Sequence, residues 1–123
     1  MIVGVGIELV DVARFASLLE RYGDRLRERL FTERERAFAA RGPRGAERLA
    51  VRFAAKLAAR RALRAGALRW REIEVVREAE GPPALRLAGD AARCAQRAGV
   101  GRLALTLTHD SHFCVGQVVL ESA

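Results

Sequence analysis

Cysteine is scarce in this chain of 123 residues, which contains only Cys94 and Cys114. Two cysteines do not make the disulfide framework of small secreted domains, and these two lack metal-ligand spacing. We therefore expect both to be free thiols buried in the fold.

Long hydrophobic runs are absent as well. No apolar stretch approaches the roughly 20 residues that cross a membrane, and the opening residues, MIVG, are not a basic segment followed by an apolar core. We expect a cytoplasmic protein without a membrane partner. It should fold as a single domain over residues 1–123, because the chain is too short for two cores.

Serine is rare and occurs only as Ser17, Ser111 and Ser122. None of the three lies in a Gly-x-Ser-x-Gly elbow, and no Gly-rich P-loop is present. The sequence therefore contains no motif for serine hydrolysis or for P-loop nucleotide hydrolysis.

Positive charge, by contrast, is in excess. The chain has 22 Lys and Arg against 15 Asp and Glu, a net charge of +7, and Lys56 is its only lysine. This balance favours a polyanionic partner, which is a nucleic acid, an acidic protein or a phosphate-rich ligand. The arginine bias also fits a GC-rich genome or a warm habitat. Specific nucleic-acid binding is the least favoured, because the few aromatic residues occupy core-like positions and form no stacking surface with the basic ones.

The first half of the chain is predicted to be a strand followed by helices. Aliphatic and β-branched residues favour a strand over residues 2–12, entering a helix near Asp11 that stops at Gly23. Thr32 followed by Glu35 has the pattern of a capping box. The expected helices cover residues 11–22, 33–40 and 46–65, the last ending at Gly66.

The longest predicted helix, residues 46–65, has two distinct sides. We expect its buried stripe to be Leu49, Phe53, Leu57 and Leu63. Basic residues recur every four positions along it and form what we term the basic ribbon: Arg48, Arg52, Lys56, Arg60 and Arg64. Such a ribbon is usually a solvated face, and otherwise a surface that binds anions.

The second half is predicted to form two hairpins separated by a helix. Strands are expected over residues 72–77 and 84–87, joined by a tight connection at residues 80–83. A helix over residues 89–98 and strands over 103–108 and 113–121, with a turn at 110–112, complete the chain. Helices mixed with antiparallel hairpins, without regular βαβ alternation, indicate an α+β fold.

Three residues are candidates for chemistry. Glu8 lies in an otherwise apolar strand, where a carboxylate is costly unless it is exposed, paired or bound to a metal. His109 and Asp110 end a strand, a common place for site residues, although Asp110 can equally cap backbone amides of a turn.

Four segments, taken in order, resemble the holo-acyl-carrier-protein synthase family. They are residues 4–10 (GVGIELV) with Arg14, similar to the family's G-x-G-x-D strand and basic first helix; residues 31–35 (FTERE), similar to its hydrophobic-T-x-x-E segment; residues 52–56 (RFAAK), similar to its R-F-A-A-K-E helix; and residues 105–109 (LTLTH), similar to its S-hydrophobic-S/T-H strand. The ending at residues 118–121 (VVLE) is also family-like.

The resemblance implies a compact 4'-phosphopantetheinyl transferase-like α+β fold, with mostly antiparallel strands packed against a long central helix. It implies a homotrimer that binds coenzyme A between neighbouring subunits. The implied reaction is magnesium-dependent and belongs to fatty acid biosynthesis and lipid metabolism. A serine of apo acyl carrier protein attacks the β-phosphate of coenzyme A, acquires 4'-phosphopantetheine and releases 3',5'-ADP.

The resemblance also implies roles for individual residues. The implied catalytic residues are Glu8, Lys56 and His109, with Glu8 as the magnesium ligand. Coenzyme A would be bound by Arg52, Lys56, Arg61, Gly81, Pro83 and His109. The acidic carrier protein would dock on Arg14, Arg21 and Arg25, where opposite charges speed the encounter.

The departures from the family pattern fall on the chemistry. Glu8 replaces the family's metal-binding aspartate, and Leu57 replaces its second metal carboxylate. A lysine common in the family's hairpin is Pro82 here. Mg²⁺ often needs only one or two carboxylates besides substrate phosphates, and Asp110 is a candidate replacement. The alternative is a catalytically degenerate relative that binds coenzyme A or carrier protein without efficient transfer.

Overall fold

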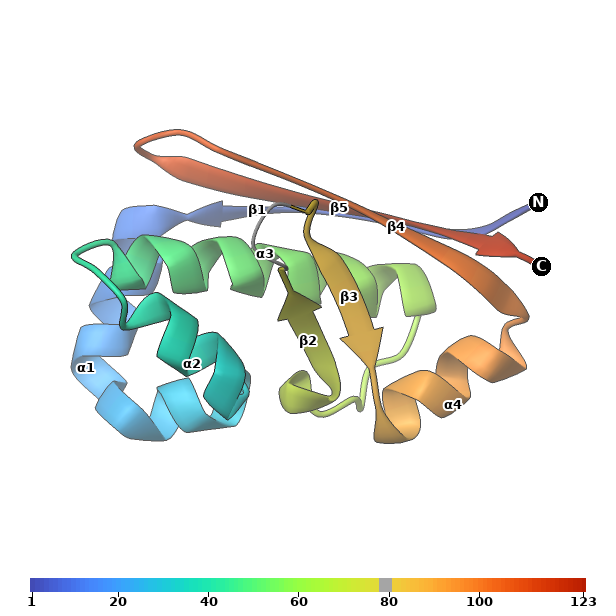
Figure 1. Cartoon of the computed structure of the whole chain (residues 1–123), viewed down its shortest axis with the longest axis horizontal. Helices are drawn as coiled ribbons and strands as arrows, with labels where there is room; N and C mark the ends of the chain where they lie inside the picture. Colours follow the sequence, from blue (N-terminus) through green and yellow to red (C-terminus); the bar gives the residue numbers. More distant parts are fainter. Residues whose placement is uncertain (78–80) are drawn as a thin grey trace.

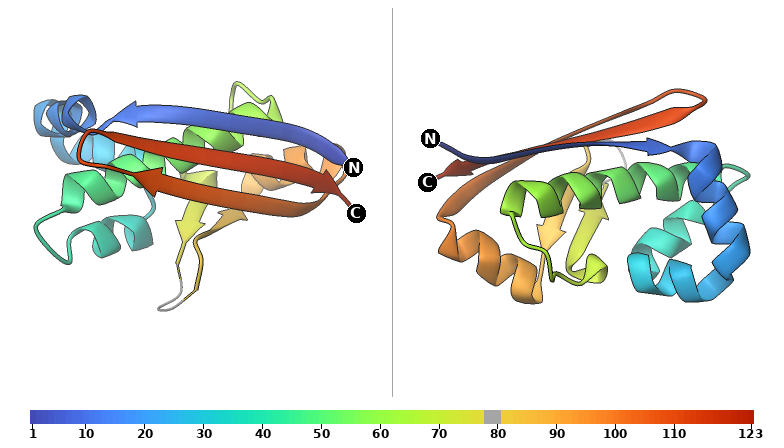
Figure 2. Two further views of the ribbon diagram at one scale, coloured as in Figure 1. Left: turned by 90° about the horizontal axis from the view of Figure 1, so that it is seen from above. Right: turned by 180° about the vertical axis from the view of Figure 1, so that it is seen from behind.

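The computed structural model describes residues 1–77 and 81–123. Its centre is helix α3 (Gly45–Leu63), which lies under an antiparallel sheet of three strands in the order β1-β5-β4 (Figures 1 and 2). These strands are β1 (Ile2–Asp11), β4 (Val100–His109) and β5 (Phe113–Ser122). The sheet covers one side of α3, and the other elements lie on the opposite side.

Those remaining elements form two groups along α3 (Figure 1). Helices α1 (Val12–Leu30) and α2 (Glu33–Ala39) pack at its N-terminal half. The short 3-10 helix η1 (Trp70–Glu72) leads into a separate antiparallel hairpin of β2 (Ile73–Val76) and β3 (Ala84–Leu87), followed by α4 (Gly89–Arg97). The predicted α+β fold, with mostly antiparallel strands against a long central helix, is confirmed.

Small residues let the sheet approach α3 closely. A side chain at Gly6 would collide with the Ala58 carbonyl, and one at Gly116 with the Ala54 backbone. The buried face of α3 is correspondingly rich in alanine: Ala50, Ala54, Ala55, Ala58, Ala59 and Ala62. The predicted stripe was therefore only half right, since Leu49 and Leu63 are buried whereas Phe53 and Leu57 are partly exposed.

Two helix ends differ from the expectation. Gly23 does not stop α1 but kinks it with a positive φ of 63°, so the helix continues to Leu30. The left-handed residue after α3 is Arg64, with φ 56°, where Gly66 was expected to end the helix. The Thr32–Glu35 capping box is present as predicted.

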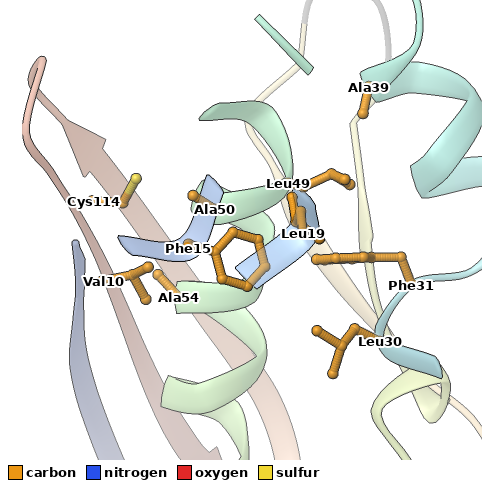
Figure 3. Close-up of a cluster of buried hydrophobic side chains, with 10 residues drawn as sticks. All are labelled: Val10, Phe15, Leu19, Leu30, Phe31, Ala39, Leu49, Ala50, Ala54 and Cys114. Atoms are coloured by element: carbon orange, nitrogen blue, oxygen red, sulfur yellow. The ribbon is translucent and has the colours of Figure 1, made fainter. Parts of the chain in front are cut away.

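A cluster of buried hydrophobic side chains joins α1 to α3 (Figure 3). Phe15 packs edge-on against Phe31, with ring centroids 6.2 Å apart, and stacks on Phe53 at 5.0 Å. Cys114 closes this cluster from β5 and is a buried free thiol, and burial raises its pKa to about 11. Cys94 is also free but only partly buried, so the burial expectation is wrong for that residue.

The face of the sheet that points away from α3 is uncovered and mostly apolar. Val5, Ile7 and Leu9 are 50%, 58% and 60% exposed on β1, and β5 places Val119, Gln117 and Val115 beside them. Strand β4 continues these rows with Ala104, Thr106 and Thr108. We call these nine residues the outer sheet face. No helix in the described ranges, 1–77 and 81–123, is long and apolar enough to cross a membrane.

Candidate anion-binding and transfer site

A cavity of about 440 Å³ lies between α2, α3 and the end of β4. We call it the arginine pocket because four arginines line it, Arg44, Arg48, Arg52 and Arg77, together with Glu47 and His109. Phe38, Pro83 and Leu107 contribute apolar walls. The structure thus brings together three predicted coenzyme A residues, Arg52, Pro83 and His109.

Arg52 is unusual among these arginines because it is only 6% exposed. Its Nη1 donates to the Arg48 carbonyl at 3.3 Å, and its guanidinium carbon lies 4.2 Å from the centroid of the Phe38 ring. Burial lowers the pKa of Arg52, the Glu35 carboxylate opposes this shift, and Arg77 and Arg48 reinforce it. A guanidinium held in such a place is well suited to meet an anion.

His109 and Asp110 have different surroundings. His109 Nδ1 lies 3.4 Å from Glu47 Oε1, at the edge of the arginine pocket. Asp110 lies in the β4–β5 turn, where its Oδ1 accepts from the backbone N–H groups of His112 (2.7 Å) and Phe113 (2.8 Å). These two backbone bonds, from Phe113 and then His112, lower the pKa of Asp110. Asp110 therefore has the turn-capping geometry, and it shares no described pocket with Glu8.

Glu8 faces α3 and lines a second cavity of about 350 Å³, which we call the Glu8 pocket. Its carboxylate forms an ion pair with Arg61, and Arg60, Arg64 and Leu57 line the same cavity. A larger cavity of about 780 Å³ shares Arg60 and Gly66 with it. The Glu8 pocket is thus also rich in cations, with one carboxylate among three arginines.

The donor set of this pocket fits Mg²⁺ only in part. Glu8 supplies one carboxylate, whereas the leucine side chain at position 57 has no donor atom. Among the residues that the structure describes, no three His, Cys, Asp or Glu side chains gather as a metal cluster. Because Mg²⁺ retains waters and takes substrate phosphates as ligands, a single protein carboxylate suits a metal that arrives with a phosphate.

Lys56 is completely buried and has three protein acceptors. Its Nζ lies 2.7 Å from Glu35 Oε1, and it donates to the carbonyls of Trp70 (3.0 Å) and Ile73 (2.5 Å). An ammonium has three N–H bonds, so all are engaged in this arrangement. Burial lowers the pKa of Lys56, and the neighbouring Glu35 opposes the shift.

The basic ribbon is therefore not a solvated face. Lys56 and Arg52 are buried, Arg48 and Arg60 are half-buried, and only Arg64 is exposed. A helix that passes through the middle of the fold has no fully solvated side, which explains why the usual interpretation of such spacing is wrong here.

The other predicted residues lie apart from these pockets. Gly81 lines a separate cavity with Pro82 rather than the arginine pocket. Arg14, Arg21 and Arg25 are all exposed on α1, although the Gly23 kink separates Arg25 from the other two. Arg21 also lies over the Tyr22 ring, at 5.4 Å from its centroid.

Seven lining residues of the arginine pocket were not predicted as site residues: Phe38, Arg44, Glu47, Arg48, Val51, Arg77 and Leu107. Arg44 continues the four-residue spacing of the basic ribbon toward the N-terminus, so that spacing was a usable signal. Arg77 and Phe38 come from other elements, and no sequence pattern links them to α3.

The α+β fold carries two arginine-lined cavities, and such cavities suit a phosphate-rich ligand. The sequence model of the 4'-phosphopantetheinyl transferase superfamily matches residues 4–115. A holo-[acyl-carrier-protein] synthase of Solibacter usitatus is 41% identical, over 99% of this chain and 100% of the relative.

Solved structures agree with this match. The holo-(acyl-carrier-protein) synthase of Bacillus anthracis in complex with CoA (3',5'-ADP) has a TM-score of 0.80 at 34% identity, covering 100% of this chain and 99% of that one. The Neisseria meningitidis enzyme has a TM-score of 0.90 at 26% identity, covering 99% and 100%. The chain belongs to the 4'-phosphopantetheinyl transferase superfamily, within which its relatives are holo-acyl-carrier-protein synthases.

Proposed function

We propose that this chain is a holo-acyl-carrier-protein synthase, which transfers 4'-phosphopantetheine from coenzyme A to a serine of apo acyl carrier protein. The observation that carries the proposal is the arginine pocket, where four arginines and His109 surround a cavity with apolar walls. That combination suits a nucleotide, since guanidinium groups bind phosphates and apolar walls accept a base.

In the proposed reaction the serine hydroxyl oxygen attacks the β-phosphorus of coenzyme A. The bond from this phosphorus to the bridging oxygen breaks, 3',5'-ADP leaves, and the serine proton passes to solvent. Arg52, with Pro83 and His109, would hold the nucleotide half, and Arg61 would neutralise the diphosphate beside Glu8. Fixed cations that meet the developing charge are the main source of catalysis in phosphoryl transfer.

Mg²⁺ enters the proposal with Glu8 as its protein ligand. When bound, the ion would supply further charge neutralisation on the diphosphate. Glu8 would hold the ion, and Arg61, the ion-pair partner of Glu8, would bind a phosphate oxygen.

Lys56 was predicted to be catalytic and to bind coenzyme A, and its three acceptors bear on how it could do so. Contact with a phosphate would require the ammonium to release Glu35 or one of the two carbonyls. In its present place Lys56 holds α3 against η1 and β2, one turn after Arg52.

A homotrimer is part of the proposal. The arginine pocket and the Glu8 pocket share no lining residue, so one coenzyme A would span both most simply if a neighbouring copy supplied one of them. The outer sheet face offers an apolar surface for such an assembly, because exposed patches of this kind mark interaction sites.

The proposed macromolecular partner is an acidic acyl carrier protein that docks on the exposed Arg14, Arg21 and Arg25. The net charge of +7 would attract it over long range. We place the protein in the cytoplasm, in fatty acid biosynthesis and lipid metabolism, with no membrane or specific nucleic-acid partner.

The test is to incubate the protein with coenzyme A, Mg²⁺ and an apo acyl carrier protein, and to measure the carrier's mass. We expect a gain of one 4'-phosphopantetheine, and a loss of at least about 10-fold in rate for Arg52→Ala, since hydrogen bonds to charged groups are worth about 1.5–3 kcal/mol. Arg97→Ala, on α4, is the control and should transfer normally. Binding of coenzyme A without any mass gain would instead identify a degenerate relative.

A further inference from the structure

Phe38 is an aromatic residue at the end of α2 whose ring is surrounded by guanidinium groups. The guanidinium carbons of Arg52, Arg48 and Arg41 lie 4.2, 5.1 and 5.8 Å from its centroid. Of these three arginines, Arg48 and Arg52 line the arginine pocket together with Phe38, and Arg41 does not. The ring thus lies near two cations that line the pocket and a third that does not.

Holding Arg48 and Arg52 so close together has an energetic cost. Arg52 is almost fully buried, and its Nε has no hydrogen-bond partner among the residues that the structure describes. Its Nη1 donates to the Arg48 carbonyl at 3.3 Å. The Glu35 carboxylate offsets part of the burial cost of Arg52, whereas Arg77 and Arg48 add like charges nearby. Without further compensation, this position at the pocket wall would be unfavourable for Arg52.

The Phe38 ring offsets part of this cost. The negative face of an aromatic ring attracts a guanidinium, more strongly where the pair is desolvated. A guanidinium stacked by its flat face keeps the N–H groups on its edge, which are the ones that grip a phosphate. Arg48 is fixed a second time, because its Nη1 donates to the Phe38 carbonyl at 3.2 Å.

We propose that Phe38 is a positioning residue that holds Arg48 and Arg52 at the wall of the arginine pocket, ready for the phosphates of the nucleotide half of coenzyme A. The proposal rests on the function proposed above and adds to it. Phe38 itself touches no reacting atom. It sets affinity for the nucleotide and leaves the transfer step unchanged.

The experiment compares Phe38→Leu with Phe38→Tyr. Leucine keeps an apolar side chain at the pocket wall and removes the ring face, whereas tyrosine keeps the ring. We expect the Kd for 3',5'-ADP, measured by calorimetry, to rise about 5- to 20-fold in Phe38→Leu and to stay within about twofold in Phe38→Tyr, as two cation–π contacts of ordinary strength require. The KM for coenzyme A should rise in parallel while kcat is kept.

Arg41→Gln provides the matched control, because it removes a guanidinium from the same ring without altering the pocket lining. It should bind 3',5'-ADP like the natural protein at physiological salt. A Phe38→Leu protein that melts normally and binds 3',5'-ADP as tightly as the natural one would overturn the proposal. So would a fall in kcat with unchanged KM. If the natural protein itself fails to bind 3',5'-ADP, the proposed function fails instead, and the two failures are distinguishable.

Discussion

Leu57 occupies a pocket otherwise lined largely by charged side chains. It lies with Glu8, Arg60, Arg61 and Arg64 in the Glu8 pocket. It also packs against the buried hydrophobic cluster that is drawn in Figure 3. A carboxylate at this position would face Glu8 across a space flanked by arginines. The side chain at position 57 therefore sets how many anionic ligands a cation in this pocket can have.

We predict that Leu57→Glu raises the transfer rate and lowers the Mg²⁺ concentration needed for half-maximal rate. A second carboxylate adds attraction for a divalent cation in a partly desolvated cavity. The change should lower the free energy of unfolding by about 1–3 kcal/mol, because a half-buried apolar contact is replaced by a carboxylate. Transfer rates over a Mg²⁺ titration, with thermal melts, measure both effects.

Leu57→Gln is the matched control, since glutamine has the same length as glutamate and lacks its negative charge. It should lose similar stability and gain no transfer. If the natural protein already turns over at about 1 per second or faster and Leu57→Glu adds nothing, another group supplies the second ligand and the assignment of position 57 is wrong.

At the scale of elements, the buried Lys56–Glu35 ion pair connects helix α2, helix α3 and strand β2. Glu35, on α2, accepts hydrogen bonds from the backbone N–H of its N-cap Thr32 (2.9 Å) and from that of Val75 on β2 (3.0 Å). Its ion-pair partner Lys56 belongs to α3. The junction that carries the arginine pocket is thus built on one ion pair.

We predict that Lys56→Met costs about 3–5 kcal/mol of unfolding free energy, because it leaves the Glu35 carboxylate buried without its cation. The double variant Lys56→Met, Glu35→Gln should recover part of that loss, since no unpaired charge remains. Chemical denaturation of the single and double variants measures the difference. A single variant as stable as the natural protein would refute the structural role. Loss of kcat in a double variant that is well folded and binds 3',5'-ADP would show that Lys56 acts on the reaction directly.

This ion pair also shows what the sequence can and cannot predict. Regular alternation and capping residues predicted the strands and most helices, because those signals act between neighbours along the chain. The stripe of α3 was partly missed, since alanines packed against glycines carry little signal. Contacts between residues far apart, such as Glu35 with Lys56 or Arg77 with Arg52, depend on the tertiary arrangement. The resemblance supplied Arg52, Pro83 and His109, whereas Phe38 became visible only in the folded protein.

At the scale of the whole molecule, the uncovered sheet face and the two separate pockets both bear on how copies of the chain assemble. In the proposed trimer, the arginine pocket of one copy would meet the Glu8 pocket of a neighbouring copy. The three rows of the outer sheet face, Val5–Val119–Ala104, Ile7–Gln117–Thr106 and Leu9–Val115–Thr108, run across all three strands. Burying the apolar side chains of this face would stabilise an assembly, and in the proposed trimer it would also bring the two pockets together.

We therefore predict that Ile7→Glu, at the middle of this face, converts a trimer into monomers and abolishes most transfer. A carboxylate buried in an apolar interface without a partner is strongly unfavourable, and symmetry would bring several copies of it together. Light scattering at micromolar protein concentration gives the mass, and the carrier mass assay gives the activity. Leu18→Glu, which changes an exposed leucine on α1, is the control for assembly and should remain a trimer. A natural protein that is monomeric, or an Ile7→Glu monomer that transfers at the normal rate, would show that a single chain holds the complete site.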